Sequence, residues 1–358
     1  MRRFYDGTRR GGAGKRQLLA LLATVAVMST ALEVVLDVGD ITQARADVAL
    51  FKYAQSFYGA SSVVARKLDQ VGIPGSQLEA PVGDLRFVET RGALMAPLAL
   101  FLGTVRLGQF GYHEIRQFAV RALKALESRS GVRHVVTTVH GPNYGLDEDE
   151  AVLALVGGLV EAFQRGSGPE GLERLTVVEL QPKRAQRLRK ALERGLGGTP
   201  GVQALPGGGG FRVQRMTAFV QAPPLATAGT VSMDKPHAFV AMPFAPELED
   251  TYHYGILGPV KAAGLLCERV DQAVFDGPII QRIRERIDTA KVVIADLSMA
   301  NPNVYLEVGY AWGKGRPTVL MVRDVKELRF DVASYRCIVY RSIRELETLL
   351  TRELERLG

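Results

Sequence analysis

Residues 292–311 read VVIADLSMANPNVYLEVGYA and decide the fold of the second half of the chain. The apolar run 292–298 has the length and composition of a strand buried in a parallel sheet. Asn301 and Pro302 then predict a helix start, because Asn caps helices and Pro suits the first helical position. Glu307 falls early in that helix, near the carboxyl ends of the strands, where open α/β sheets place their ligand sites. We take Glu307 as a candidate functional residue, the alternative being a solvated helix carboxylate.

Strand and helix patterns alternate through the rest of this half. The candidate strands are 237–244, 265–271, 291–298, 317–323 and 336–340. Helical patterns occupy 248–263, 278–289, 303–313 and 343–357. Strands separated by helices of this length form right-handed crossovers, so we expect a flavodoxin-like, parallel, five-stranded sheet.

The first half also mixes the two periods, which predicts an α/β sandwich. Its candidate strands are 31–38, 48–51, 133–139, 175–180 and 211–216, and its candidate helices are 112–128, 148–165 and 183–196. The glycine run 207–210 predicts an exposed hairpin or loop tip. A stretch rich in Ala and Pro follows, and its composition is that of a linker. The expected organisation is a tail at 1–30, a domain at 31–221, a linker at 222–235 and a second domain at 236–358.

The formal charge of +7 is concentrated at the start of the chain, where residues 1–16 hold six basic side chains and one acidic one. The remainder is close to neutral, so no nucleic-acid partner is expected. The apolar run 18–28 meets Glu33 before it is long enough to span a bilayer. Cys267 and Cys337 lie inside predicted strands and make no disulfide framework. These features predict a cytoplasmic protein, with membrane contact through 18–28 as the alternative.

Five separated segments of the second half carry a family resemblance: 239–244, 279–290, 295–298, 301–309 and 330–340. Their order and spacing resemble a bacterial family related to nucleoside 2-deoxyribosyltransferases and Toll/interleukin-1 receptor (TIR)-like domains, over about residues 236–345. The resemblance implies N-glycosidic bond chemistry. In those relatives a Glu on the helix after the third strand acts at the anomeric carbon of the sugar, and Glu307 matches that position. A carboxylate suits this role because it stabilises an oxocarbenium-like transition state.

The same resemblance implies roles for residues around Glu307. Asp296 and Asn303 would hold sugar hydroxyls or orient the catalytic carboxylate, although Asp296 is explained equally well as a turn residue. Phe244 and Tyr310 would flank the base. The remaining substrate-binding candidates are Met242, Pro243, Asp271 and Ser298. NAD is the expected substrate, and no cofactor is required.

The first half resembles the opening of a macro-type domain. Residues 33–42, EVVLDVGDIT, place a Gly-Asp-Ile-Thr turn before a buried strand. Residues 137–148, TTVHGPNYGLDE, form a later strand-to-helix junction, where glycines permit close backbone approach to an anion. Macro domains bind ADP-ribose-like molecules, so the resemblance implies a ligand site at Asp40, Gly141 and Gly145.

Other residues in this half qualify that resemblance. The segment 52–58, KYAQSFY, stands where macro domains usually carry an Asn-rich stretch. Asp147 is interpreted as the cap of the following helix rather than as a ligand-binding residue. His140 has no second His or Cys at metal-ligand spacing, so no metal site is expected.

Together the resemblances imply that a macro-like domain senses a nucleotide and a second domain hydrolyses NAD or a related nucleotide. Bacterial defence systems often join a nucleotide sensor to an NAD-consuming effector, and we expect this protein to self-associate. One alternative is a non-catalytic nucleotide-binding signalling module. Another is a nucleoside deoxyribosyltransferase, which the uncertain position of a proton-donating acid disfavours.

Overall fold

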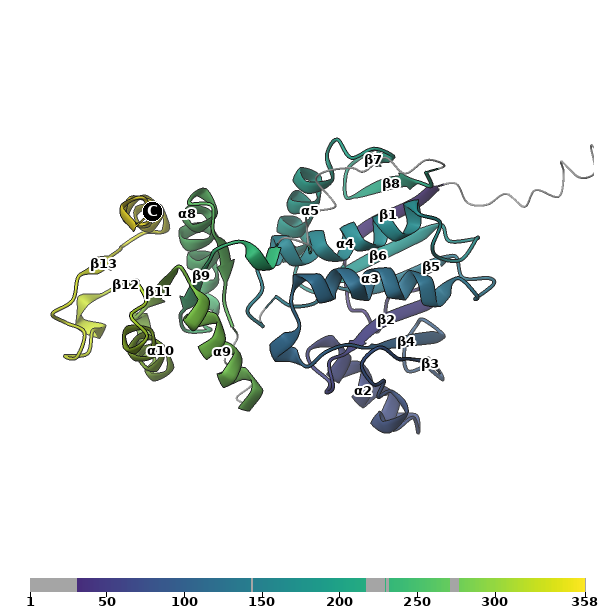
Figure 1. The fold of residues 1–358 in the computed structure, drawn as a ribbon, viewed down its shortest axis with the longest axis horizontal. Helices are drawn as coiled ribbons and strands as arrows, with labels where there is room; N and C mark the ends of the chain where they lie inside the picture. Colours follow the sequence, from purple (N-terminus) through teal and green to yellow (C-terminus); the bar gives the residue numbers. More distant parts are fainter. Residues whose placement is uncertain (1–30, 143, 217–228, 230–231, 271–276, 358) are drawn as a thin grey trace, which may run out of the picture.

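The computed structural model describes residues 31–142, 144–216, 229, 232–270 and 277–357. The chain is an α/β protein with two sheets, one of eight strands and one of five (Figure 1). The eight-stranded sheet belongs to the N-terminal half, drawn from purple to teal, and the five-stranded sheet to the C-terminal half, drawn from green to yellow. The expected α/β class is confirmed for both halves.

The N-terminal sheet has a parallel centre and antiparallel edges. Its strands are β1 (Ala31–Val38), β2 (Val48–Tyr53), β3 (Leu85–Glu89), β4 (Leu98–Gly103), β5 (His134–Thr138), β6 (Arg174–Glu179), β7 (Val202–Ala204) and β8 (Gly210–Gln214). They lie in the order β3-β4-β2-β5-β6-β1-β8-β7, and the five from β4 to β1 are parallel. The glycine run joins β7 to β8 as the expected hairpin.

Helices cover both faces of this sheet. α3 (Tyr112–Leu126), α4 (Glu148–Gln164) and α5 (Pro182–Leu196) pack on one face, and α2 (Ala60–Gln70) packs on the other. Strand β2 serves both cores, since Val48 and Leu50 face α3 and α4 while Ala49 and Phe51 face α2. Two 3₁₀ turns, η1 (Gly75–Gln77) and η2 (Leu107–Gln109), lie in the connections. The sequence did not predict α2, β3, β4 or β7.

The C-terminal sheet is entirely parallel, as expected. Its strands β9 (His237–Ala241), β10 (Leu266–Glu268), β11 (Val292–Asp296), β12 (Thr318–Val322) and β13 (Cys337–Val339) lie in the order β10-β9-β11-β12-β13. One face is covered by α7 (Pro246–Asp250), the π-helical η4 (Thr251–Ile256), α8 (Leu257–Ala262) and α11 (Ile343–Leu357). The other face is covered by α9 (Gly277–Thr289) and α10 (Pro302–Gly313). The 3₁₀ turns are η3 (Ser232–Asp234), η5 (Ser298–Ala300) and η6 (Val325–Glu327).

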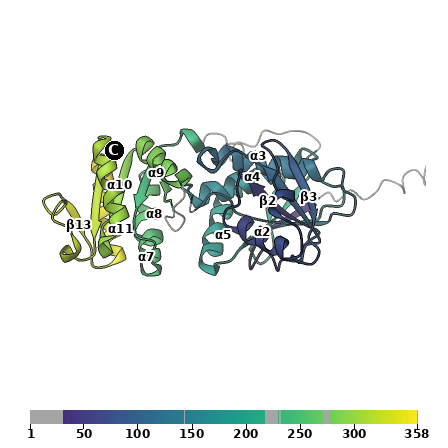
Figure 2. The same ribbon diagram turned by 90° about the horizontal axis from the view of Figure 1, so that it is seen from below.

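The two halves lie side by side, with α8 and α9 on the side of the C-terminal domain nearest the N-terminal domain (Figure 1, Figure 2). Tyr112 donates a hydrogen bond to the buried Glu268 on β10, at 2.7 Å. Tyr144 forms an antiparallel bridge with Val270, just beyond β10. The outer edge of β10 is therefore covered by the N-terminal domain and is not open to pairing with another strand.

Some sequence-based predictions concern residues outside the described part of the chain. These are the apolar run 18–28, Asp271 and most of the linker 222–235. Within the described ranges, no helix combines the length and apolar character needed to cross a membrane.

Candidate functional site

A cavity of about 540 Å³ opens at the carboxyl edge of the N-terminal sheet. Its walls come from the turn after β1, the end of β2, the loop into α2, the loop after β5 and the end of β6. Parallel strands that end together leave a crevice at this edge, which is the usual ligand site of open α/β sheets. The volume falls in the ordinary range for small-molecule sites.

The start of α2 forms one wall of this cavity. Residues Gly59 to Val63 line it, and α2 is an eleven-residue helix with no acidic side chain in its first turn. The Ser61 hydroxyl donates to the carbonyl of Lys52 at 3.0 Å, which fixes the helix start against β2. The partial positive charge of a helix N-terminus favours an anion at this wall.

Lys52, the last but one residue of β2, lines the same cavity although its side chain is only 5% exposed. Its Nζ lies 4.8 Å from the ring centroid of Phe110, 5.8 Å from that of Tyr58 and 6.0 Å from that of Tyr144. Within the described residues, Nζ makes these ring contacts but no hydrogen bond or ion pair. Burial lowers the pKa of the Lys52 amine from 10.5 to about 8.

His140 lies in the loop after β5 and also lines the cavity, with 5% exposure. Its ring packs edge-to-face against Phe118, with centroids 4.6 Å apart. Its Nε2 finds no hydrogen-bond partner among the described residues. Burial, together with the charge of Lys52, lowers the pKa of His140 from 6.5 to about 3, so the imidazole is neutral at physiological pH.

The three residues proposed for a macro-like site have different positions. Gly141 lines the cavity with φ 103°, and a Cβ there would come within 2.5 Å of the Leu146 side chain. Asp40 accepts a hydrogen bond from the Thr42 amide at 2.8 Å and lines a neighbouring hollow of about 260 Å³. Gly145 lies instead at the domain contact, where its amide donates to the Arg269 carbonyl at 3.2 Å. Only Gly141 of the three lines the main cavity.

A second, smaller cavity of about 130 Å³ lies between the domains and shares part of its wall with the first. The residues common to both are Pro142, Gln181 and Arg184. On the C-terminal side it is lined by the aromatic residues Phe244 and Tyr252, with Arg269, Glu249 and His253. The Arg269 guanidinium lies 4.5 Å from the Phe244 ring centroid and 4.1 Å from that of Tyr252.

Ion pairs neutralise the charges around this interdomain cavity. Glu148 pairs with Arg187 at 2.8 Å and with Arg184 at 3.3 Å. Glu249 pairs with Arg269 at 2.9 Å, and its other carboxylate oxygen lies 3.3 Å from His253 Nε2. The hydrogen bond from His253, together with the charge of Arg269, lowers the pKa of Glu249 to about 2. This arrangement is that of a structural contact between domains.

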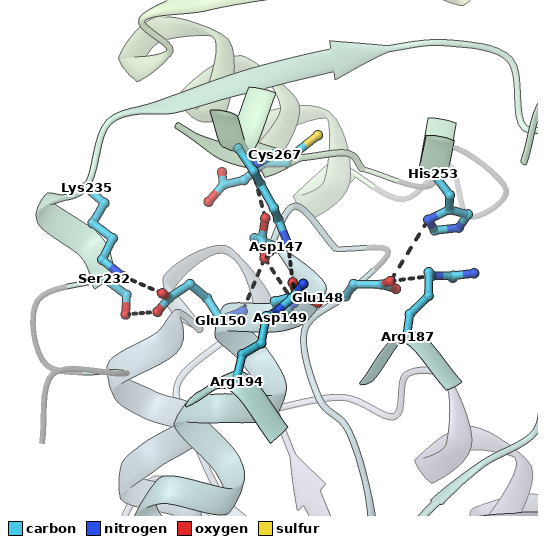
Figure 3. Close-up of polar contacts among 12 residues, drawn as sticks. Asp147, Glu148, Asp149, Glu150, Arg187, Arg194, Ser232, Lys235, His253 and Cys267 are labelled. Atoms are coloured by element: carbon cyan, nitrogen blue, oxygen red, sulfur yellow. Dashed lines mark hydrogen bonds and ion pairs between the residues drawn. The ribbon is translucent and has the colours of Figure 1, made fainter. Parts of the chain in front are cut away.

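The acidic start of α4 holds the two domains together (Figure 3). Asp147 caps the helix as predicted, since its Oδ1 accepts from the amides of Asp149 and Glu150. Its Oδ2 accepts from the Cys267 amide on β10 at 3.1 Å. Glu150 accepts from Ser232 and pairs with Lys235, at the entry to the C-terminal domain. The capping role was evident from the sequence, but the contact with Cys267, 120 residues away, was not.

Glu307, the candidate catalytic carboxylate, lies on α10 and is 6% exposed. The helix begins as expected, with the Asn301 side chain accepting from the Asn303 amide at 3.0 Å and Pro302 at the first position. The carboxylate is therefore buried in the C-terminal domain and is not the solvated helix residue of the alternative interpretation. Asn303 is half-buried near the start of the same helix.

Asp296 and Ser298 are joined to each other at the end of β11. Asp296 is fully buried, and its Oδ1 accepts from the Ser298 amide at 3.0 Å while its Oδ2 accepts from the Tyr340 hydroxyl at 2.8 Å. The Ser298 hydroxyl accepts from the Arg323 amide at 3.0 Å. Burial raises the pKa of Asp296 despite these donors. These bonds connect the ends of β11, β12 and β13.

The other C-terminal candidates point to different surroundings. Tyr310 donates to the Asp288 carboxylate on α9, at 3.1 Å. Met242 and Pro243 are buried after β9, and Phe244 lies in the wall of the interdomain cavity. Of these candidates, Asp296 and Ser298 are therefore in direct contact, whereas Phe244 lies at the contact with the N-terminal domain.

Comparisons with solved structures give a likeness in the N-terminal part of the chain. No protein-family model matches the chain, and no curated protein matches it. The macrodomain of Oceanobacillus iheyensis, solved with ADP, aligns at TM-score 0.35 and 12% identity, covering 44% of this chain and 89% of that one. The macrodomain of Trypanosoma brucei, solved in complex with ADP-ribose, aligns at TM-score 0.37 and 16% identity, covering 44% of this chain and 68% of that one. At these scores the likeness carries no argument about ligand or activity, which must come from the site itself.

Proposed function

We propose that the N-terminal domain binds an ADP-ribose-like nucleotide in the cavity of about 540 Å³. One observation carries the proposal: at the carboxyl edge of the parallel strands, this cavity combines a helix N-terminus with the buried cation of Lys52. Both features favour a negatively charged group such as a diphosphate. The Gly-Asp-Ile-Thr turn, from which the sequence predicted a macro-like ligand site, lies at the same edge.

The cavity also offers surfaces for the uncharged parts of a nucleotide. Ile41, Val139 and Val178 supply apolar wall, which suits the flat face of a base. Gly141 lets the backbone after β5 take the left-handed turn that shapes this wall, since a Cβ there would clash with the Leu146 side chain. A nucleotide diphosphate joined to a second sugar would use the apolar, glycine-lined and cationic surfaces together.

Calorimetric titration with ADP-ribose tests this binding. We expect one site per chain in the wild type. Ser62→Trp, which places an indole at the cavity wall, should abolish the binding. Lys124→Trp is the matched control, because Lys124 is exposed on α3 outside the cavity lining. Unchanged affinity in Ser62→Trp would place the ligand elsewhere and refute the proposal.

We further propose that the C-terminal domain cleaves an N-glycosidic bond in NAD or a related nucleotide, with Glu307 as the catalytic carboxylate. Its support is the family resemblance of residues 236–345 and the burial of Glu307 on α10, the α-helix that follows the third strand of this domain. Water would add to the anomeric carbon as nicotinamide leaves, giving ADP-ribose, nicotinamide and a proton. NAD is the substrate here, and no cofactor is required. Depletion of NAD in response to a nucleotide is the action we propose for this protein in bacterial defence.

Release of nicotinamide, followed by chromatography, tests the catalytic proposal. The wild type should release nicotinamide, and the assay is run both with and without ADP-ribose. Glu307→Gln should reduce the rate at least 100-fold, which is on the order expected when a group that stabilises a transition-state charge is lost. Glu347→Gln on α11 is the control, since Glu347 is exposed. No nicotinamide from the wild type under any nucleotide would exclude NAD cleavage. Base exchange on deoxynucleosides would instead indicate a transferase.

A binding module without catalysis is the second candidate, and the bonds of Asp296 favour it. Both of its carboxylate oxygens are already used, by the Ser298 amide and the Tyr340 hydroxyl. If the domain only binds, calorimetry with NAD should show an intact ligand, and Glu307→Gln should leave its affinity unchanged. Light scattering with and without nucleotide would test the proposed self-association in either case.

The contact between the domains connects the nucleotide cavity to the C-terminal domain. Tyr144 lines the cavity and pairs through its backbone with Val270. Arg184 belongs to the walls of both cavities. We propose that the bound nucleotide acts on the C-terminal domain through these residues.

A further inference from the structure

Lys52 is the one charged residue of the buried strand β2. All six residues of β2 are buried, and the other five are apolar or aromatic. Burying an ammonium group is costly unless a counter-charge or hydrogen-bond acceptors compensate it. Among the described residues, Lys52 has neither a counter-charge nor a hydrogen-bond acceptor for its Nζ.

The aromatic rings around Nζ offset only part of that cost. Phe110, Tyr58 and Tyr144 lie at centroid distances of 4.8 to 6.0 Å, and a cation at such distances gains roughly 0.5 to 2 kcal/mol. The rings hold the amine in place without neutralising it. On the side that the rings do not cover, the amine faces the cavity that Lys52 lines.

Within the described part of the chain, His140 is a second buried polar residue at this cavity that lacks a hydrogen-bond partner for one of its atoms. It is equally buried, it lines the same cavity, and its Nε2 has no hydrogen-bond partner among the described residues. Both groups line one cavity, and the charge of Lys52 contributes, after burial, to the lowered pKa of His140. A neutral imidazole can donate one hydrogen bond to an anion when its tautomer carries the proton on Nε2.

We propose that Lys52 and His140 form a subsite for a phosphate group of the ligand. The ammonium supplies the counter-charge and up to three donors, and the imidazole supplies one more. A phosphate oxygen placed between them would complete the hydrogen bonding of two buried groups in one step. This inference rests on the proposed nucleotide site, and it adds that the cavity selects ligands by phosphate at one defined wall.

The segment around Lys52 explains why this subsite belongs to this chain in particular. Residues 52–58 stand where the sequence departs from the Asn-rich stretch of macro domains. An amide-rich stretch can bind neutral hydroxyls, whereas a buried cation requires a negative partner. The buried charge of Lys52 therefore favours an anionic group at this wall.

The test compares ADP with adenosine, which lacks phosphate, by calorimetry on the wild type and three variants. Lys52→Met keeps the length of the side chain and removes the charge, Lys52→Arg keeps the charge, and Lys124→Met on the exposed face of α3 is the control. We expect Lys52→Met to weaken ADP binding at least 10-fold and to leave adenosine binding within 2-fold. Lys52→Arg should retain part of the ADP affinity, and Lys124→Met should change neither.

Inorganic phosphate, titrated and followed by ³¹P NMR, separates this inference from the nucleotide proposal. Phosphate binding that is lost in Lys52→Met supports the subsite even if no nucleotide binds. ADP and adenosine binding equally, with Lys52→Met indifferent, overturns the subsite and leaves the nucleotide site standing. Failure to bind phosphate or any nucleotide overturns both. Circular dichroism of each variant establishes that it is folded before titration.

Discussion

Replacing Lys52 with Met should stabilise the unliganded protein, contrary to the usual effect of core substitutions. Burial lowers the pKa of this amine from 10.5 to about 8. Because each pKa unit is worth about 1.4 kcal/mol, the charged amine costs roughly 3 kcal/mol of folding stability at neutral pH. Losing the contacts with the aromatic rings takes back roughly 0.5 to 2 kcal/mol. The net gain expected for Lys52→Met at pH 7 is therefore about 1 to 3 kcal/mol.

The pH dependence gives this prediction its signature. The unfolded lysine titrates near 10.5 and the folded one near 8, so between these values the unfolded state binds more protons. Stability of the wild type should then rise with pH from about 8 to 10.5, and the advantage of Lys52→Met should vanish above that range. The titratable and charged groups that line the cavity with this amine are the His140 imidazole, the phenols of Tyr58 and Tyr144, and the ion pair of Glu179 with Arg184 at 3.3 Å.

Urea denaturation at pH 7, 9 and 10.5 measures both effects. Lys124→Met, at an exposed position, should lie within about 0.5 kcal/mol of wild type at every pH. A Lys52→Met protein less stable than wild type at pH 7, or a difference independent of pH, would refute the reasoning. Either result would mean that the charge of the amine is already compensated within the protein and requires no anionic ligand.

Three further predictions concern stability, each measured by urea denaturation. Asp147→Ala removes the cap of α4 and the acceptor of the Cys267 amide, so it should cost about 2 to 4 kcal/mol; a loss below 1 kcal/mol would show that the domain contact does not depend on this carboxylate. Tyr340→Phe leaves Asp296 without its hydroxyl donor and should cost about 1 to 3 kcal/mol, and an unchanged midpoint would contradict the structural role given to this bond. Burial lowers the pKa of His140 to about 3 from 6.5, so wild-type stability should fall as pH drops from 6.5 towards 3, and His140→Leu should remove up to about 1.4 kcal/mol per pH unit of that dependence.

Local signals in the sequence predicted much of the C-terminal domain. All five strands and the sheet type followed from alternating apolar runs and helical periods, because each βαβ unit is specified within about thirty residues. The caps of α10 and α4, Asn301 and Asp147, were also predicted, since capping depends on the residue and its next three neighbours.

The edges of the N-terminal sheet were harder to predict. β3 is half-exposed, and its residues lack a clear alternation of apolar and polar side chains. β7 has three residues, too few for a periodic pattern. α2 is short, and its buried positions depend on packing against residues from other segments.

The site itself depends on contacts that no local pattern contains. Lys52 is surrounded by Tyr58, Phe110 and Tyr144, which come from three different segments. The sequence predicted a strand over 48–51 only, so Lys52 fell in the segment after it and was not singled out. Gly145 was expected near a ligand because of its glycine-rich loop, yet the approach of another domain places it at a protein contact.

Hydrogen–deuterium exchange with and without ADP-ribose tests the central claim most directly. If the cavity binds the nucleotide, amides at residues 58–63 and 138–142 should exchange more slowly in its presence, because these segments form the walls. Slower exchange at 266–270 as well would show that the effect reaches the C-terminal domain through the Tyr144–Val270 pair. Saturating ligand that leaves both wall segments unchanged would contradict the account.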